Sequence, residues 1–154
     1  MFPTRDGTRV LPAASQATQR VLRLQHRSHP KEGSMHVIID GYGGDPDQLS
    51  DENVVRVILD RYPEMMGMTK ITQPTVLEYR GSKPEDWGVS GYVMIAESHI
   101  AMHTFPERRL VWADIFSCKD FDAEPVLADL RQRFGLQDME VRTLERNLEP
   151  IPAA

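Results

Sequence analysis

The stretch that decides the fold is residues 88–117, which read GVSGYVMIAESHIAMHTFPERRLVWADIFS. Apolar side chains form three short runs here, at about 89–97, 99–105 and 109–116, and Pro106 ends the second run. Short runs rich in Val, Ile and Phe that are bounded by turn residues are typical of β-strands. Strands joined by such short connections pair as antiparallel neighbours, so this stretch predicts a mainly antiparallel sheet.

On the amino-terminal side, the pattern predicts a strand, a helix and a further strand. The first strand covers about 36–40 and leads into a glycine-rich turn. Ser50 has the position of a helix N-cap, and acidic residues follow it where the positive end of the helix dipole favours them. Pro63 is expected to stop this helix, and a strand is expected at about 69–79. The helix presents one apolar face, made of Val54, Val55, Ile58 and Leu59.

On the carboxyl side, the pattern predicts a second helix and a last strand. The helix opens at Asp122 and ends at Gly135, and the strand covers about 139–144. Its buried face is expected to consist of Val126, Leu127, Leu130 and Phe134. These elements together predict an α+β fold, a two-layer sandwich with helices on one face of a mainly antiparallel sheet.

Length and composition point to a compact enzyme domain. The chain has 154 residues, which is enough for one domain with a sizeable core. Its net charge of -5 argues against nucleic acid, which would require a basic stripe. No apolar run approaches the roughly 18 residues that cross a bilayer, so we expect a soluble protein without a membrane partner. The single cysteine, Cys118, leaves no internal disulfide, which fits a cytoplasmic location.

Residues 1–34 differ in composition from the rest of the chain. Arginine and lysine are set there among Ser, Gln, Thr and Pro, with few acids. We expect a flexible tail of residues 1–34, followed by one folded domain over 35–154. An alternative is that Met35 marks the true start of the folded protein, and the sequence leaves both interpretations open.

The centre of the strand region carries an unusual set of reactive side chains. Glu97, Ser98, His99 and His103 lie close together in a stretch that is otherwise apolar, and Cys118 follows. A Ser-His pair in a strand is ordinarily a packed hydroxyl beside a surface imidazole. Two histidines four residues apart would bind zinc from one face of a helix. Their neighbours predict strand and turn instead, so we do not expect a zinc site.

The full constellation resembles the self-processing segment of bacterial and archaeal S-adenosylmethionine decarboxylases. In that family a Glu-Ser peptide bond breaks, and the serine becomes a covalently bound pyruvoyl group. The resemblance extends from about His36 to the region near Leu148. It rests on Gly88-Val-Ser90-Gly91, on Glu97-Ser98-His99 with His103-Thr, and on Asp114-Ile-Phe-Ser-Cys118.

The resemblance implies that this chain is a proenzyme cut between Glu97 and Ser98. Residues 1–97 would become the β chain, and residues 98–154 the α chain with the pyruvoyl group at its new amino terminus. The group acts as the electron sink for decarboxylation, in place of pyridoxal phosphate. The family architecture is the two-layer sandwich predicted above, and the small bacterial type is a homodimer of processed protomers.

The resemblance also implies roles for individual side chains. His103 matches the base that drives the elimination step of processing, and Ser90 matches a serine that supports processing through hydrogen bonding. Cys118 matches the proton donor of the decarboxylation, a role that suits a thiol because it is mostly protonated near neutral pH. Glu107 matches an acid that binds the substrate, with an ordinary solvated turn residue as the less favoured alternative.

The substrate is the part of the resemblance that this sequence departs from. Relatives that use S-adenosylmethionine commonly have Trp where this chain has Phe105, and many have Cys at the position of Gly44. The window before the Gly-Val-Ser-Gly motif contains Glu85 and Asp86 beside Trp87. Trp87 could stack on an adenine, whereas the two carboxylates suit a terminal ammonium or guanidinium.

Three functions therefore stand at this point. The first is decarboxylation of S-adenosylmethionine in polyamine synthesis, and the second is the same pyruvoyl chemistry on L-ornithine or L-arginine, giving putrescine or agmatine. The third is an unprocessed binding module that regulates a partner decarboxylase. The presence of Ser98, His103 and Cys118 together argues against the third function, because a binding module has no chemical use for all three.

Overall fold

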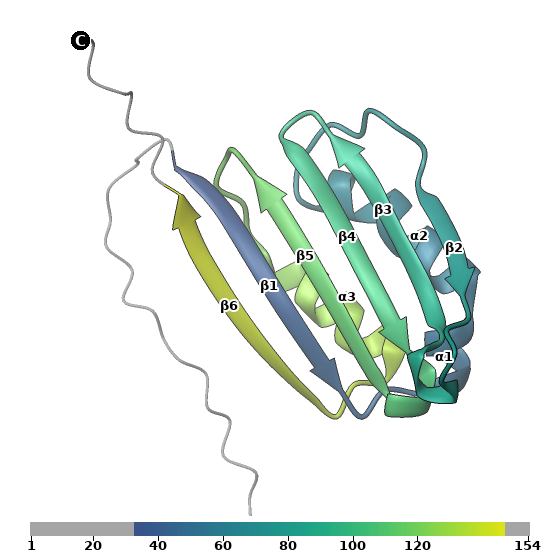
Figure 1. Ribbon diagram of the computed structural model, residues 1–154. Coiled ribbons are helices and arrows are strands. Elements are labelled where there is room, and N and C mark those ends of the chain that lie inside the picture. Colours follow the sequence, from purple (N-terminus) through teal and green to yellow (C-terminus); the bar gives the residue numbers. More distant parts are fainter. Residues whose placement is uncertain (1–32, 147–154) are drawn as a thin grey trace, which may run out of the picture. The chain divides into compact units, whose positions relative to one another are not determined.

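The protein is described here from a computed structural model that places residues 33–146. Figure 1 shows one sheet with helices on one side of it, so the predicted α+β two-layer sandwich is confirmed. The predicted flexible tail falls almost entirely outside the described residues. No described helix is long and apolar enough to cross a membrane.

The sheet has six strands, and every neighbouring pair is antiparallel. Their spatial order is β2-β3-β4-β5-β1-β6, so the first strand of the chain lies between the last two. The predicted run of three consecutive strands forms the β3-β4-β5 meander (Figure 1). The strands are β1 Ser34–Tyr42, β2 Thr75–Tyr79, β3 Gly88–Ile95, β4 Ser98–Phe105, β5 Leu110–Ser117 and β6 Asp138–Arg146.

One predicted strand is much shorter than expected. The pattern predicted a strand over 69–79, but β2 begins only at Thr75. Before β2, Lys70 forms an isolated bridge with Ile95. The segment from this bridge to the start of β2, residues 71–74, is irregular. Pro74 lies at the boundary and has no N–H to donate to a ladder, which explains why the regular pairing starts after it.

Two predictions about the first helical region were wrong. The structure has a short α1, Pro46–Ser50, and then α2, Glu52–Met65, so Ser50 ends a helix and does not cap one. The N-cap of α2 is Asp51, whose Oδ1 accepts a hydrogen bond from the Asn53 N–H at 2.8 Å. Pro63 does not stop α2 but lies inside its last turn. Its missing N–H leaves one bond to the carbonyl four residues earlier unmade, and the helix ends two residues later.

The second predicted helix is confirmed as α3, Glu124–Phe134. Asp122 lies just before it, and its Oδ1 accepts a hydrogen bond from the Glu124 N–H at 3.0 Å. Gly135 ends the helix in the left-handed conformation, with φ at 61°, which glycine adopts without steric cost. The four apolar residues expected on its inner face are all buried.

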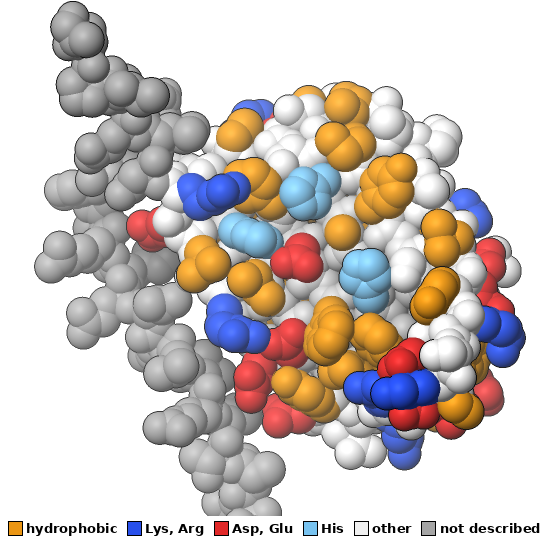
Figure 2. Space-filling view, in the orientation of Figure 1, with side chains coloured by type: hydrophobic (Ala, Val, Ile, Leu, Met, Phe, Trp, Pro, Cys, Tyr) orange, Lys and Arg blue, Asp and Glu red, His pale blue; other side chains and the backbone are white. Residues whose placement is uncertain are grey.

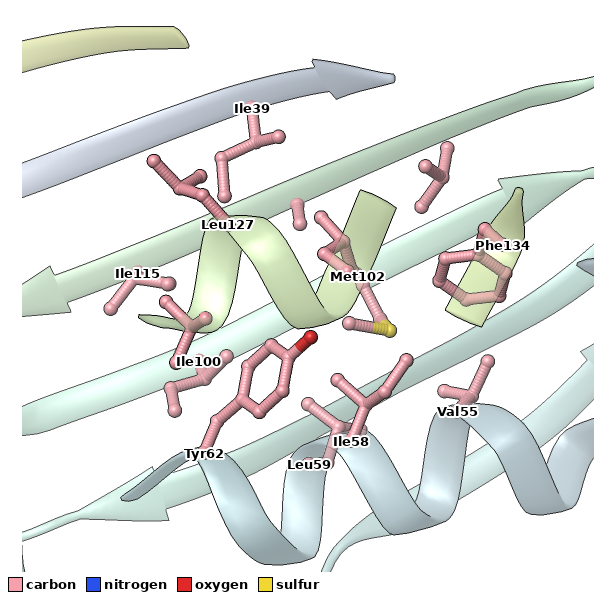
Figure 3. Close-up of a cluster of buried hydrophobic side chains, with 14 of the residues drawn as sticks. Ile39, Val55, Ile58, Leu59, Tyr62, Ile100, Met102, Ile115, Leu127 and Phe134 are labelled. Atoms are coloured by element: carbon pink, nitrogen blue, oxygen red, sulfur yellow. The ribbon is translucent and has the colours of Figure 1, made fainter. Parts of the chain in front are cut away.

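The hydrophobic core lies between the sheet and the helices. Figure 3 shows side chains of α2 and α3 packed against those of the central strands. Along β4 the burial alternates: Ile100 and Met102 point into the core, whereas His99 and His103 lie on the other face. We call this other, helix-free face the open face of the sheet. The histidines are therefore kept out of the core by the same period-2 pattern that identified the strand.

Candidate active site

The predicted scissile bond lies in the hairpin turn between β3 and β4. Glu97 is in that turn, and Ser98 is the first residue of β4. The turn is tied to the chain before β2, because the Ala96 N–H donates a hydrogen bond to the Thr69 carbonyl at 2.8 Å. It is also next to the end of β5, since Ser98 faces Ser117 in the sheet. The Glu97–Ser98 bond is thus held between two other segments.

Glu97 is anchored by three hydrogen bonds. Its backbone carbonyl accepts one from the Cys118 N–H at 3.0 Å. Its side chain, in a residue only 6% exposed, accepts one at Oε1 from the Lys119 ammonium at 2.8 Å and one at Oε2 from the Thr69 N–H at 3.1 Å. The bond from Lys119, and then that from Thr69, lower the pKa of Glu97 below its usual value. The same pair raises the pKa of Lys119.

The bond from the Cys118 N–H bears directly on reactivity. It reaches the oxygen of the carbonyl that precedes Ser98, which is the carbonyl a serine hydroxyl would attack. A donor aimed at this oxygen stabilises the negative charge that develops there during attack. The structure therefore places Cys118 at the predicted cleavage site. Its exposed side chain leaves the thiol free.

A base lies beside the Ser98 hydroxyl. The Oγ of Ser98 is 3.2 Å from Nδ1 of His99, whose ring packs edge-on against Phe116 at 5.9 Å between centroids. An imidazole at this distance is positioned to accept the hydroxyl proton. Sequence reasoning interpreted His99 as a surface imidazole beside Ser98 or as a metal ligand, and assigned it no catalytic contact. Its only signal was direct adjacency to Ser98.

Ser90 and His103 form a second group, in the middle of the open face. They face each other across β3 and β4, and the Ser90 Oγ is 2.9 Å from the His103 Nδ1. His103 lies five residues along β4 from Ser98. At about 3.3 Å per residue, this corresponds to about 16 Å. The structure brings Ser90 and His103 together but separates both from Ser98 within one chain.

The predicted substrate-binding residues form a third group, at the end of β4 farthest from Ser98. They lie around two short 3-10 helices, η1 (Pro84–Asp86) and η2 (Pro106–Arg108). The Trp87 Nε1 is 3.5 Å from a carboxylate oxygen of Glu107. The Arg80 guanidinium lies over the Trp87 ring, 4.7 Å from its centroid.

In the acidic pair of this third group, Glu85 and Asp86, the Asp86 side chain already has an ion-pair partner within the chain. The Asp86 carboxylate forms an ion pair with Arg108 at 2.6 Å. The Glu85 backbone carbonyl accepts a second hydrogen bond from Arg108, at 3.1 Å. The charge of Asp86 is therefore already compensated within the chain.

The open face as a whole combines polar chemistry with apolar surface. Figure 2 views the molecule in the orientation of Figure 1 and shows histidine, acidic and hydrophobic side chains exposed over the sheet. Strand register places His36 beside Asp114 on this face, 3.0 Å apart. Large apolar side chains on the same face are at least 40% exposed: Tyr42, Leu77, Tyr79, Tyr92, Met94, Trp112 and Leu144.

The residues at Ser98 fit a self-generated carbonyl cofactor. A pyruvoyl group there requires a serine hydroxyl, a base within reach and an activated carbonyl before the serine, and Ser98, His99 and the Cys118 N–H supply these. Within residues 33–146, by contrast, no group of three or more His, Cys, Asp or Glu is arranged to hold a metal ion.

Comparisons with known proteins identify the family of this chain. A family model described as S-adenosylmethionine decarboxylase matches residues 35–147. An S-adenosylmethionine decarboxylase proenzyme of Clostridium botulinum is 31% identical over 117 residues, which are 75% of this chain and 96% of that protein. One of Archaeoglobus fulgidus is 39% identical over 85 residues, 55% of this chain and 70% of that protein.

The fold is also shared with a solved structure. The crystal structure of the adenosylmethionine decarboxylase from Aquifex aeolicus superposes with a TM-score of 0.64, covering 79% of this chain and 97% of that one at 23% identity. The sequence matches establish the family relationship, and the solved structure shows that the fold is shared. This chain belongs to the S-adenosylmethionine decarboxylase family, whose members are enzymes that carry a pyruvoyl group made from one of their own serines.

Proposed function

We propose that this chain cuts itself between Glu97 and Ser98 and then decarboxylates S-adenosylmethionine, releasing CO2. The observation that carries the proposal is the geometry at this bond: a hydroxyl 3.2 Å from an imidazole, next to a carbonyl that a backbone N–H polarises. The matched relatives of Clostridium botulinum and Archaeoglobus fulgidus are named as S-adenosylmethionine decarboxylase proenzymes, which supports both halves of the proposal.

Cleavage begins with an acyl shift from nitrogen to oxygen. The Ser98 Oγ attacks the Glu97 carbonyl carbon, and its proton passes through the His99 Nδ1 to the amide nitrogen as the C–N bond breaks. The Cys118 N–H stabilises the charge on the Glu97 carbonyl oxygen meanwhile.

Elimination completes the cut. His103 removes the Ser98 α-proton, and the bond between Cβ and Oγ of Ser98 breaks. Oγ leaves with the backbone carbonyl of Glu97, which becomes the terminal α-carboxylate of the first fragment. The dehydroalanine left at position 98 is hydrolysed to the pyruvoyl group and ammonia.

In the mature enzyme, the pyruvoyl group supplies the electron sink that decarboxylation needs. Cys118 is next to it in the fold, and its exposed thiol holds a proton for the substrate's α-carbon. Glu107 and Trp87 lie even farther from Ser98 along β4 than His103 does, so in this proposal they bind the substrate from the second copy of a homodimer. The indole ring, over which Arg80 lies in the single chain, is the stacking surface for adenine.

S-adenosylmethionine is favoured over a basic amino acid because of Arg108. The alternative substrates, L-ornithine and L-arginine, were suggested by the negative charge of Glu85 and Asp86. The ion pair between Asp86 and Arg108 compensates half of that charge. Either substrate would place the enzyme in polyamine synthesis, and the single cysteine fits the cytoplasm as its location.

The working enzyme in this proposal is a homodimer joined through the open faces. In one chain, His103 and Ser90 lie about 16 Å along the strand from Ser98, too far for direct proton transfer. A second copy that packs on the open face with two-fold symmetry brings its own His103 toward the first copy's Ser98. It also covers the exposed apolar side chains of that face, among them Tyr92, Met94 and Trp112.

The Ser98→Ala variant tests self-cleavage. Without Oγ no acyl shift can occur, so we expect one uncut chain on a denaturing gel, whereas the wild-type protein gives two fragments that meet at residues 97 and 98. Intact-mass measurement locates the cut and detects the pyruvoyl terminus. A Ser98→Ala protein that is cleaved normally would refute the proposed processing.

Product identification tests the substrate. The cleaved wild-type protein is incubated separately with S-adenosylmethionine, L-ornithine and L-arginine, and the products are identified by mass spectrometry. We expect decarboxylated S-adenosylmethionine, and the Ser98→Ala protein serves as the inactive control. Putrescine or agmatine as the main product would instead assign the enzyme to a basic amino acid.

A further inference from the structure

We propose that Lys119 is a positioning residue for self-cleavage, acting through the carboxylate of Glu97. This inference rests on the proposed cleavage between Glu97 and Ser98. Lys119 lies in the loop after β5 and reaches across to the β3–β4 turn, where its ammonium binds the Glu97 Oε1 at 2.8 Å. It therefore links the residue before the scissile bond to the segment that carries Cys118.

The loop that presents Lys119 is itself fixed. The Lys119 N–H donates a hydrogen bond to the Oγ of Ser117, at 3.0 Å, and Ser117 is fully buried at the end of β5. The next N–H along the chain toward β5, that of Cys118, binds the Glu97 carbonyl. The backbone of this loop and the Lys119 side chain thus hold both ends of Glu97, its carbonyl and its carboxylate.

Burial makes the contact more than a surface ion pair. The Glu97 side chain is only 5% exposed, although that of Lys119 is 66% exposed. A buried carboxylate needs partners for its charge, and Glu97 has the Lys119 ammonium on one oxygen and the Thr69 N–H on the other. Loss of Lys119 leaves this carboxylate with a neutral donor only, so the turn is expected to rearrange toward water.

Charge gives Lys119 a second effect, on the reaction itself. When Oγ attacks, negative charge develops on the Glu97 carbonyl oxygen, in the same residue as the ionised side chain. A carboxylate without a countercharge this close repels the developing negative charge and so destabilises the intermediate. The positive charge of the Lys119 ammonium offsets this repulsion. After elimination, Glu97 carries two carboxylates, because Oγ remains with its carbonyl carbon, and the same ammonium is available to both.

The test is the rate of self-cleavage of newly synthesised full-length chains, followed on denaturing gels. We expect Lys119→Met to slow cleavage roughly tenfold and Lys119→Arg to restore most of the rate, since it keeps the positive charge. Lys83→Met is the matched control, because Lys83 has no ion pair within the described part of the chain. It should cleave at the wild-type rate.

A double variant separates positioning from general stability. Glu97→Gln combined with Lys119→Met removes the uncompensated carboxylate, so it should cleave faster than Lys119→Met alone. Thermal unfolding of Lys119→Met in the uncleavable Ser98→Ala background shows whether the fold is intact. The role of Lys119 would be overturned if Lys119→Met cleaved itself at the wild-type rate. It would also be overturned if the double variant cleaved itself more slowly than Lys119→Met. Wild-type chains that never cleave would instead refute the processing proposal.

Discussion

At the scale of single residues, the backbone and the side chain of Cys118 are separate groups, and sequence analysis assigned a role to the side chain only. Its backbone N–H binds the carbonyl of the predicted scissile bond, whereas its thiol is exposed. In the mechanism that we propose, the backbone contact serves processing and does not depend on the side chain. The thiol serves turnover, where a proton must reach the substrate. A substitution that keeps the backbone therefore separates the two.

We expect Cys118→Ala to cleave itself at close to the wild-type rate and yet to turn over substrate poorly. The backbone donor to Glu97 remains, while loss of a general acid typically costs about a hundredfold or more in rate. Cleavage is followed on denaturing gels and turnover by CO2 release. Turnover equal to that of the wild-type enzyme would remove the thiol as proton donor.

His99 and His103 are assigned to different steps, and chemical trapping distinguishes them. In the His99→Gln chain we expect the bond between Glu97 and Ser98 to remain an amide, because no base accepts the Ser98 hydroxyl proton. In the His103→Gln chain we expect the ester to accumulate, because the elimination that follows it is blocked. Neutral hydroxylamine cleaves esters but not amides, so it should cut the His103→Gln chain and leave the His99→Gln chain intact. An intact His103→Gln chain, or rapid self-cleavage of His99→Gln, would contradict this assignment.

At the scale of elements, the β3–β4 hairpin carries two groups of reactive residues. Ser98 and His99 lie beside its turn, and the Ser90–His103 pair lies farther along its strands. Gly88 begins β3 at the open end of the hairpin, where the strands approach closely. A Cβ built on Gly88 would lie 1.8 Å from the carbonyl oxygen of Thr104. Thr104 itself is 2% exposed, and its hydroxyl accepts a hydrogen bond from the Val89 N–H at 2.9 Å. The Gly-Val-Ser-Gly motif is therefore partly a packing requirement.

We expect Gly88→Ala to lower the free energy of unfolding by about 3 kcal/mol, because a backbone carbonyl cannot move aside as a side chain can. Urea denaturation in the Ser98→Ala background measures this on a single uncut chain. Gly67→Ala is the contrast: φ is 68° there, but beyond the two neighbouring residues of the chain no atom lies within 4 Å of the added Cβ. That variant should lose about 1 kcal/mol, from the left-handed conformation alone. Equal losses would refute the steric explanation.

At the scale of the whole molecule, the mechanism that we propose needs reactive groups that lie far apart within one chain. The Ser98 and Cys118 group lies at one end of the sheet, and the His103 and Ser90 pair lies in the middle of the open face. Two chains packed through these faces would combine the first group of one with the second group of the other.

Co-expression of two inactive variants tests this combination. Ser98→Ala and His103→Gln chains should each remain uncut alone. Together they form mixed dimers in which the Ser98→Ala chain supplies His103 to its partner, so we expect cleavage of the His103→Gln chain. A tag of different length on each chain identifies the fragments on a gel. The complete absence of cleavage in the mixture, with mixed dimers confirmed by affinity capture, would show that each chain uses its own histidine.

Much of this protein was determined by local sequence. Strand periodicity identified the β3-β4-β5 meander, and the apolar face of α3 was predicted residue by residue. The motif around Glu97–Ser98 identified the family. These signals are local because side-chain alternation and helix periodicity depend only on neighbours along the chain. Element boundaries were predicted less well. Ser50 lies where two helices meet in one region of turn-forming residues, and Pro63 is accommodated in the last turn of α2.

Only the tertiary structure decided which reactive residues meet. The position of β1 between β5 and β6, the hydrogen bond from Cys118 to Glu97 and the reach of Lys119 all depend on pairing between distant segments. No local pattern records these contacts, because strand order and register are set by the packing of the entire sheet.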